Sequence, residues 1–178
     1  MRSFIAIQLP KKVREECIKV QEKIKDFVKA KFVEEENFHI TLKFLGNIDE
    51  EKVKEISKTL KDLHFKPFKL KLCNLGVFPS EKFVRVIWIG VKPKEKLLEL
   101  QKRIDDCLAT IGFKKEKRFE GHITIARIKY VKDRKSLLEE LRKTKPKDVE
   151  FEVKSFELKK STLTEKGPIY ETLSVFSS

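Results

Sequence analysis

A pattern of strand, long helix and strand occurs twice in this 178-residue chain, and each copy ends in nearly the same four residues. The first motif, His-Ile-Thr-Leu, begins at residue 39, and the second, His-Ile-Thr-Ile, begins at residue 122, which is 83 residues later. A repeat of about half the chain predicts two similar lobes around a shared central cleft. Because no linker or low-complexity stretch separates the copies, we expect one bilobal domain over residues 1–178.

Hydrophobic periodicity along the chain predicts an α+β fold. Apolar residues at steps of three and four predict helices from Pro10 to about Ala30, after Asp49 to about Leu63, from Pro93 to about Ile111, and over residues 133–144. Apolar runs that alternate with polar residues or are nearly continuous predict strands at residues 2–9, 38–45, 68–72, 83–91, 119–130, 149–160 and 169–176.

The charge balance favours a polyanionic partner. The chain has 41 Lys and Arg against 28 Asp and Glu, a formal net charge of +13, and nucleic acid is the first partner that such an excess suggests. The abundance of Lys and Glu, with only three Asn and three Gln, is also typical of proteins from hot environments. The charge therefore supports an RNA partner without deciding the matter.

Other classes of protein are disfavoured. The three cysteines, Cys17, Cys73 and Cys107, are far apart and form no C-x-x-C pair, so we expect free thiols rather than a zinc ribbon or a disulfide framework. No apolar run approaches the roughly 18–20 residues that span a bilayer. The apolar N-terminal stretch is too short for a signal peptide, so we interpret it as a first strand and expect a cytoplasmic protein without membrane contact.

Strand geometry gives the two motifs their chemical meaning. Residues i and i+2 of a strand face the same way, so His39 and Thr41 share one face, and so do His122 and Thr124. A lone strand histidine is more often structural than catalytic. Two copies at half-chain spacing reverse that expectation, because related lobes would bring two imidazoles and two hydroxyls into one cleft.

Two imidazoles suit displacement at phosphorus. With an ordinary pKa of about 6.5, one can act as a base while the other acts as an acid. The attacking and leaving oxygens lie roughly in line, so one histidine can serve each side of the phosphorus. The threonines can donate hydrogen bonds to the non-bridging oxygens. This scheme requires no metal and no other cofactor.

A zinc site is the competing interpretation of the histidines. Catalytic zinc usually has three protein ligands, and the sequence has no H-x-H, H-E-x-x-H or Cys/His cluster. The third histidine, His64, follows the second predicted helix, and we expect a structural or surface role for it. Serine-hydrolase chemistry is also weakly supported, since there is no G-x-S-x-G motif.

The paired H-x-T motifs resemble those of the 2H phosphoesterase superfamily. The residues in and around the motifs are similar to those of its RNA 2′,3′-cyclic phosphodiesterase branch, also called the 2′-5′ RNA ligase family. The resemblance covers nearly the whole chain. The matching stretches are residues 2–7 (RSFIAI), 39–46 (HITLKFLG), 85–90 (RVIWIG), 121–127 (GHITIAR) and 167–170 (GPIY).

The resemblance implies two related lobes of antiparallel sheet with helices outside. It also implies a reaction that opens a 2′,3′-cyclic phosphate at an RNA end to leave a 2′-phosphate. His39 would protonate the departing 3′ oxygen, His122 would activate water, and Thr41 and Thr124 would hold the phosphate oxygens. In a related transfer, a 5′-hydroxyl replaces water and a 2′-5′ linkage forms.

Three further groups of side chains are weaker candidates. Arg127 matches an arginine of the family and suits a phosphate chemically, but strict alternation would point it away from His122 unless a bulge re-aims it. Lys43 has the parity of His39, and we expect a solvated strand lysine there. Aromatic residues could stack on bases, although core packing is the expectation for most of them.

The predicted function is therefore an RNA 2′,3′-cyclic phosphodiesterase that acts as a monomer on RNA with a cyclic phosphate end. Two alternatives stay open. The same basic cleft could belong to an RNA-binding module without catalytic activity. It could also belong to a phosphodiesterase for a small cyclic nucleotide or an ADP-ribose-type cyclic phosphate.

Overall fold

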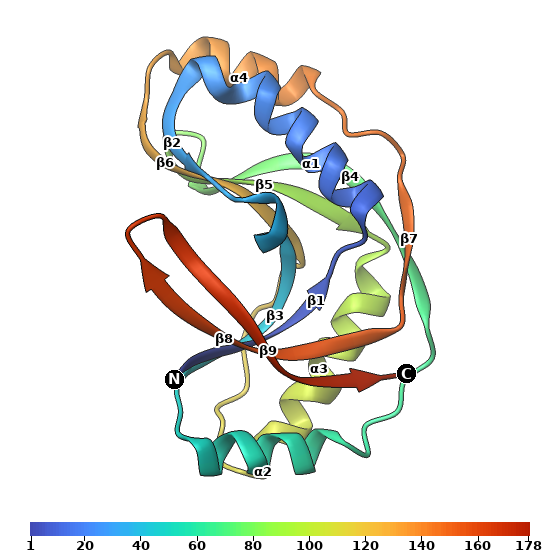
Figure 1. Cartoon of the computed structure of the whole chain (residues 1–178). Helices are drawn as coiled ribbons and strands as arrows, with labels where there is room; N and C mark the ends of the chain where they lie inside the picture. The colour runs from blue at the N-terminus through green and yellow to red at the C-terminus, as the bar shows by residue number, and fades with distance from the viewer.

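A curled antiparallel sheet forms the body of the protein (Figure 1). The computed structural model describes residues 1–178. Its nine strands are β1 (Arg2–Gln8), β2 (Val28–Phe32), β3 (His39–Asn47), β4 (Phe68–Ser80), β5 (Phe83–Lys92), β6 (His122–Val131), β7 (Glu150–Val153), β8 (Ser155–Thr164) and β9 (Gly167–Ser177). They lie in the order β7-β4-β5-β6-β3-β1-β8-β9, and β2 pairs with β6. The predicted α+β fold is confirmed.

The sheet consists of two pseudo-symmetric halves, which confirms the predicted lobes. β3 and β6 lie side by side at its centre, where Ile40 pairs with Ile123. β1 flanks β3 as β5 flanks β6, and β8 and β4 follow on the two sides. The strands that carry the two motifs therefore meet at the junction of the lobes.

Four helices cover the outside of the sheet: α1 (Lys11–Ile24), α2 (Glu50–Leu60), α3 (Lys94–Ala109) and α4 (Arg134–Lys143). α1 packs beside α4, and α2 packs against α3 (Figure 1). α1 contacts β6 whereas α3 contacts β3, so the long helix of each repeat covers the motif strand of the other repeat. None of the helices combines the length and the apolar character that crossing a membrane requires.

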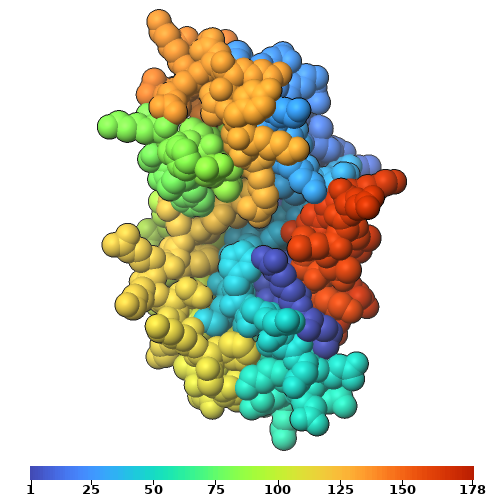
Figure 2. Space-filling view, turned by 90° about the vertical axis from the view of Figure 1, so that its left-hand side faces the viewer, coloured from blue at the N-terminus to red at the C-terminus, as the bar shows by residue number.

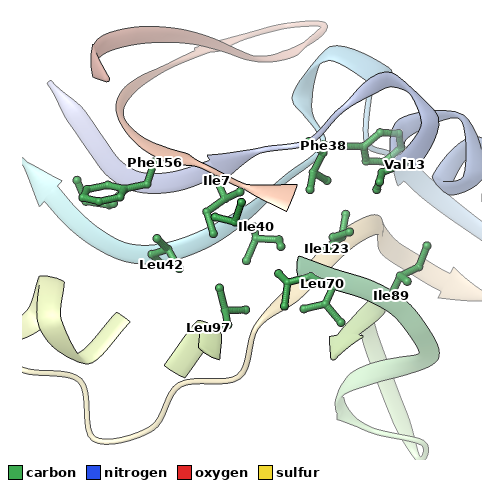
Figure 3. Packing of buried hydrophobic residues seen from close by; sticks show 14 of the residues in the cluster. Ile7, Val13, Phe38, Ile40, Leu42, Leu70, Ile89, Leu97, Ile123 and Phe156 are labelled. Carbon is green, nitrogen blue, oxygen red and sulfur yellow. The ribbon is translucent and has the colours of Figure 1, made fainter. Parts of the chain in front are cut away.

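The aliphatic residues of the motifs anchor the core. Ile40 and Ile123 have no solvent exposure, and they pack among Ile7 of β1, Leu42 of β3 and Leu97 of α3 (Figure 3). Burial of such a side chain contributes about 1.5–3 kcal/mol. Because alternate residues of a strand face opposite ways, the histidines and threonines of both motifs are left on the opposite face of the sheet.

The first predicted helix is too long. α1 ends at Ile24, a 3₁₀ turn occupies Lys25–Phe27, and β2 then pairs with β6. The sequence of β2, Val-Lys-Ala-Lys-Phe, alternates with the period of a strand, and its pairing with β6 prevails over the helical spacing, which Phe27 continues only by coincidence. The helix predicted to reach Ala30 is wrong over its last six residues.

The strand predicted over residues 149–160 is two strands. β7 pairs with β4 in one lobe, and β8 pairs with β1 in the other. The buried positions change from odd numbers, Phe151 and Val153, to even numbers, Phe156 and Leu158, across the junction at Lys154. This change of parity is the sequence signal that separates the two strands.

Both motif strands contain a β-bulge just after the motif threonine. On β3, Leu42 is the extra residue, since Thr41 and Lys43 pair with consecutive residues of β1. On β6, Ile125 is the extra residue, since Thr124 and Ala126 pair with consecutive residues of β5. A bulge places two successive side chains on one face and reverses the alternation beyond it.

The bulge on β3 corrects the prediction for Lys43, which is buried instead of solvated. Its Nζ lies 2.6 Å from Asp105 Oδ1 and 2.7 Å from the carbonyl oxygen of Lys114. The second carboxylate oxygen of Asp105 accepts the backbone N–H of Glu116 at 2.8 Å. This ion pair therefore ties the first motif strand to α3 and to the segment that leads into the second motif.

Removing one partner of this buried pair should destabilise the protein strongly, because the other charge stays buried. We expect Asp105→Ala to lower the free energy of unfolding by about 3–5 kcal/mol in urea denaturation. The matched control is Asp106→Ala on the same helix. It breaks an exposed 2.8 Å pair with Lys115 and should change stability little. Equal effects of the two substitutions would contradict the role assigned to the buried pair.

Candidate active site

The structure brings both motifs together on the concave face of the sheet. Ile40 pairs with Ile123 in antiparallel register, so one further step places His39 opposite Thr124 and Thr41 opposite His122. The histidines and threonines are half-buried. Figure 2 shows this face, which is hollowed between the β8–β9 hairpin (red) and the yellow-to-orange region of β6 and the segment before it.

Each imidazole is fixed by a backbone carbonyl two residues earlier. His39 Nδ1 lies 2.7 Å from the carbonyl oxygen of Asn37, and His122 Nδ1 lies 2.8 Å from that of Glu120. A carbonyl can only accept, so both Nδ1 atoms carry the hydrogen. In each neutral ring, Nε2 is then the atom with the lone pair. His39 Nε2 lies 2.9 Å from the Oγ1 of Thr41, which can donate to it.

Aromatic rings hold both imidazoles in the same way. His39 packs against Phe4 and Tyr170, with ring centroids 5.1 and 5.3 Å away. His122 packs against Phe78 at 5.0 Å, with Trp88 at 5.9 Å. These four aromatics line the site, and the sequence alone does not distinguish them from core aromatics. Such contacts restrict the rotation of the imidazoles, which keeps the two Nε2 atoms oriented.

A glycine precedes the second motif because the backbone there lies against α3. A Cβ atom at Gly121 would collide with the side chain of Leu97. Any larger residue would therefore force either the Leu97 side chain or the backbone before His122 to shift. The equivalent position in the first motif is Phe38, whose side chain is buried, so the two halves seat their motifs differently.

The pKa of His39 is lowered to about 4. Burial is the main cause, because it penalises the charged imidazolium, and the positive charges of Lys159, Arg127 and His122 act in the same direction. The hydrogen bond with Asn37 opposes the shift. In the free protein, His39 is consequently neutral at pH 7.

Lys159 is a site residue that sequence reasoning missed. It follows buried Leu158 in β8 and is itself buried, so no simple alternation reveals it. Its Nζ lies 2.7 Å from Gln8 Oε1 and 3.4 Å from Glu157 Oε2, and Gln8 pairs with His39 across the sheet. A buried cation therefore lies close to the first motif histidine.

Arg127 lies on the same face as His122, the orientation that the sequence predicted only if a bulge re-aimed it. The bulge at Ile125 turns the arginine out of the core, and its charge lowers the pKa of both His39 and Tyr170. Burial nevertheless raises the pKa of Tyr170 overall. The pseudo-equivalent residue after the bulge on β3 is Phe44, which is 68% exposed.

His64 does not belong to this site. It lies in a separate pocket with Phe65, Lys96 and Arg103, between the end of α2 and the first half of α3. No group of three or more His, Cys, Asp or Glu side chains is arranged to hold a metal ion.

Comparisons with known proteins identify relatives over the full chain. The family model for LigT-like phosphoesterases matches residues 7–88 and 89–170, which are the two repeats. A protein of Methanocaldococcus jannaschii named RNA 2′,3′-cyclic phosphodiesterase is 47% identical over 97% of this chain and 98% of its own length. A protein of the same name from Archaeoglobus fulgidus is 38% identical over 99% of both chains.

Solved structures agree with this relationship. The crystal structure of E. coli LigT complexed with 3′-AMP superimposes with a TM-score of 0.82 at 27% identity, covering 99% of this chain and 97% of that one. A Thermus thermophilus protein gives the same TM-score at 29% identity, with the same coverage of both chains.

The low pKa of His39 can be measured by NMR. We expect its imidazole to titrate near pH 4, with ¹⁵N shifts of the Nδ1–H tautomer, and His39→Ala identifies its resonances. Lys159→Gln should raise the pKa of His39, because it removes a nearby positive charge. A midpoint near the ordinary value of about 6.5 would show that the ring is more hydrated than the structure indicates.

Proposed function

The chain belongs to the LigT-like phosphoesterase family, and from this premise we propose that it is an RNA 2′,3′-cyclic phosphodiesterase that leaves a 2′-phosphate. One observation carries the proposal. Two imidazoles on adjacent strands, each with Nδ1 bonded to a carbonyl, leave two Nε2 atoms for proton transfer in one concave site. The names of the relatives support the cyclic phosphate as the substrate.

In the proposed reaction, the oxygen of a water molecule attacks phosphorus while His122 Nε2 takes a proton from that water. The bond between phosphorus and the 3′ oxygen breaks, and protonated His39 gives its Nε2 proton to that oxygen. Both histidines change protonation state in one turnover, so proton exchange between the site and solvent must restore them. The 2′ ester bond remains, which accounts for the position of the product phosphate.

The remaining side chains stabilise the phosphate. Thr41 and Thr124 are the proposed donors to the non-bridging oxygens, because each lies across the strand pair from the histidine of the other motif. Arg127 is the proposed counter-charge, since its guanidinium faces the same cleft and is suited to phosphate. These groups, together with the two histidines, form the proposed site.

The low pKa of His39 couples its protonation to substrate binding. An imidazolium at this position is disfavoured in the free protein by burial and by the positive charges of Lys159 and Arg127. A bound phosphate anion supplies the opposite charge and raises the pKa of His39. We therefore propose that His39 gains its proton as the substrate binds, which keeps the acid ready only when a leaving group is present.

RNA is the proposed substrate, with the net charge of +13 as support. We propose that residues 1–178 act as one bilobal domain, because the sheet is continuous through both lobes. We further propose that the protein acts as a monomer in the cytoplasm and that it can also form 2′-5′ linkages when a 5′-hydroxyl replaces water.

Loss of either histidine should reduce opening of the cyclic phosphate by about 10²–10⁴-fold. The assay uses a short RNA with a 2′,3′-cyclic phosphate end, with and without EDTA, and circular dichroism checks that His39→Ala and His122→Ala remain folded. Activity should survive EDTA. If wild type only binds the RNA, the RNA-binding module is the better interpretation. If wild type opens only a mononucleoside cyclic phosphate, the phosphodiesterase for a small cyclic nucleotide is the better interpretation.

The pH dependence of the His122→Ala variant tests the acid role of His39. Its residual kcat/KM should fall as pH rises through the pKa of His39, since the protonated form is lost above it, and this pKa should lie above the wild-type value of about 4 because the variant lacks the charge of His122. The limb in kcat should lie at higher pH, because the bound anion raises that pKa. A residual rate that increases with pH through this region would reverse the two roles and make His39 the base.

A further inference from the structure

An open pocket of about 780 Å³ adjoins His122. Its walls come from the start of α3, from the segment before β6 and from Phe78 of β4. The volume falls within the range of about 300–1,000 Å³ typical of ligand sites. His122 is itself part of the lining, so a molecule in this pocket lies beside the residue that the proposed function makes the base.

The lining of this pocket is strongly cationic. It carries four basic side chains and one carboxylate: Lys94, Lys102, Lys117, Arg118 and Glu120. Lys94 is the basic residue that Glu120 neutralises, at 3.8 Å. Lys102, Lys117 and Arg118 are exposed and form no ion pair. Three free cations around one pocket fit a ligand with several phosphates, such as a nucleic-acid backbone.

The pocket beside His39 has a different charge. It measures about 450 Å³ and contains Gln8, Asn37 and Tyr170, all of which adjoin His39. Its charged residues are two carboxylates and one amine, Glu36, Glu157 and Lys159, and the amine is paired with Glu157. The pocket beside His122 therefore offers a polyanion more unpaired positive charge than the pocket beside His39 does.

We infer that the pocket lined by Lys102, Lys117 and Arg118, called the acceptor pocket here, binds the backbone of a second RNA strand and presents its terminal hydroxyl to His122. The inference rests on the proposed function, because it places the nucleophile on the side of the base. The strand that carries the cyclic phosphate then has its leaving oxygen at His39, at the opposite end of the site.

The chemical step follows the hydrolysis with an alcohol in place of water. The hydroxyl oxygen of the second strand attacks phosphorus, and His122 takes its proton. The bond from phosphorus to the 3′ oxygen breaks, and that oxygen receives the proton of His39. One phosphodiester bond forms as one breaks, so no further reactant is consumed, and the partition between hydrolysis and transfer depends on occupancy of the acceptor pocket.

The test compares two triple variants that remove the same charge. The pocket variant is Lys102→Gln, Lys117→Gln and Arg118→Gln, and the control is Lys12→Gln, Lys19→Gln and Lys23→Gln on exposed positions of α1. Fluorescence anisotropy measures binding of a short single-stranded RNA with hydroxyl ends over a range of salt. A second assay adds this RNA to a cyclic-phosphate RNA and measures the ratio of joined to hydrolysed product.

We expect the pocket variant to bind the hydroxyl RNA at least about tenfold more weakly than wild type. Its salt slope should fall by about 2, at about 0.7 for each of three lost phosphate contacts. The ratio of joined to hydrolysed product should fall with the binding, and the control variant should match wild type in both assays.

Equal losses in the two variants would overturn the acceptor pocket and show that the charge acts non-specifically. Binding at the pocket without any joined product in wild type would overturn the assignment of the bound hydroxyl as the nucleophile. Hydrolysis of the cyclic-phosphate RNA alone is measured in parallel. Its absence in wild type would mean that the proposed function fails, an outcome separate from the binding result.

Discussion

Ile40 and Ile123 pair across β3 and β6, and the geometry of the site depends on this contact. The pair is fully buried, so neither strand can slip by one residue without exposing its own isoleucine and burying its own histidine. The same register places the histidine of each motif opposite the threonine of the other. Hydrophobic burial on one face of the sheet thus determines the arrangement of the polar groups on the opposite face.

Approximate symmetry builds this site, and departures from symmetry give its two ends different properties. Both histidines bond to a carbonyl through Nδ1 and pack against two aromatic rings. Beyond the paired bulges, however, one strand presents the phenyl ring of Phe44 and the other the guanidinium of Arg127. A reaction that uses one acid and one base is helped by such a difference, because identical environments would give the two imidazoles identical tendencies to hold a proton.

The buried Lys43–Asp105 pair links stability to the second half of the site. Asp105 holds the N–H of Glu116, and Lys43 holds the carbonyl of Lys114. The segment fixed in this way continues through Lys117 and Arg118 to Gly121, where close packing on Leu97 sets the start of β6. A charge buried under the first motif strand therefore helps to position the cationic wall of the pocket beside His122.

The sequence by itself determined the repeat, the fold class and the shared strand face of the histidine and threonine in each motif. Strand alternation and helical spacing are local properties, and they appear in both halves of the chain. The sequence also indicated that Arg127 could face His122 only through a bulge. The tertiary structure decided the bulges, the burial of Lys43 and the place of Lys159 beside His39. These features arise from pairing between segments far apart in the chain, where the energy of burying one residue depends on a partner that local pattern does not identify. The low pKa of His39 has the same origin, since it results from burial and from charges that β6 and β8 bring to an imidazole on β3.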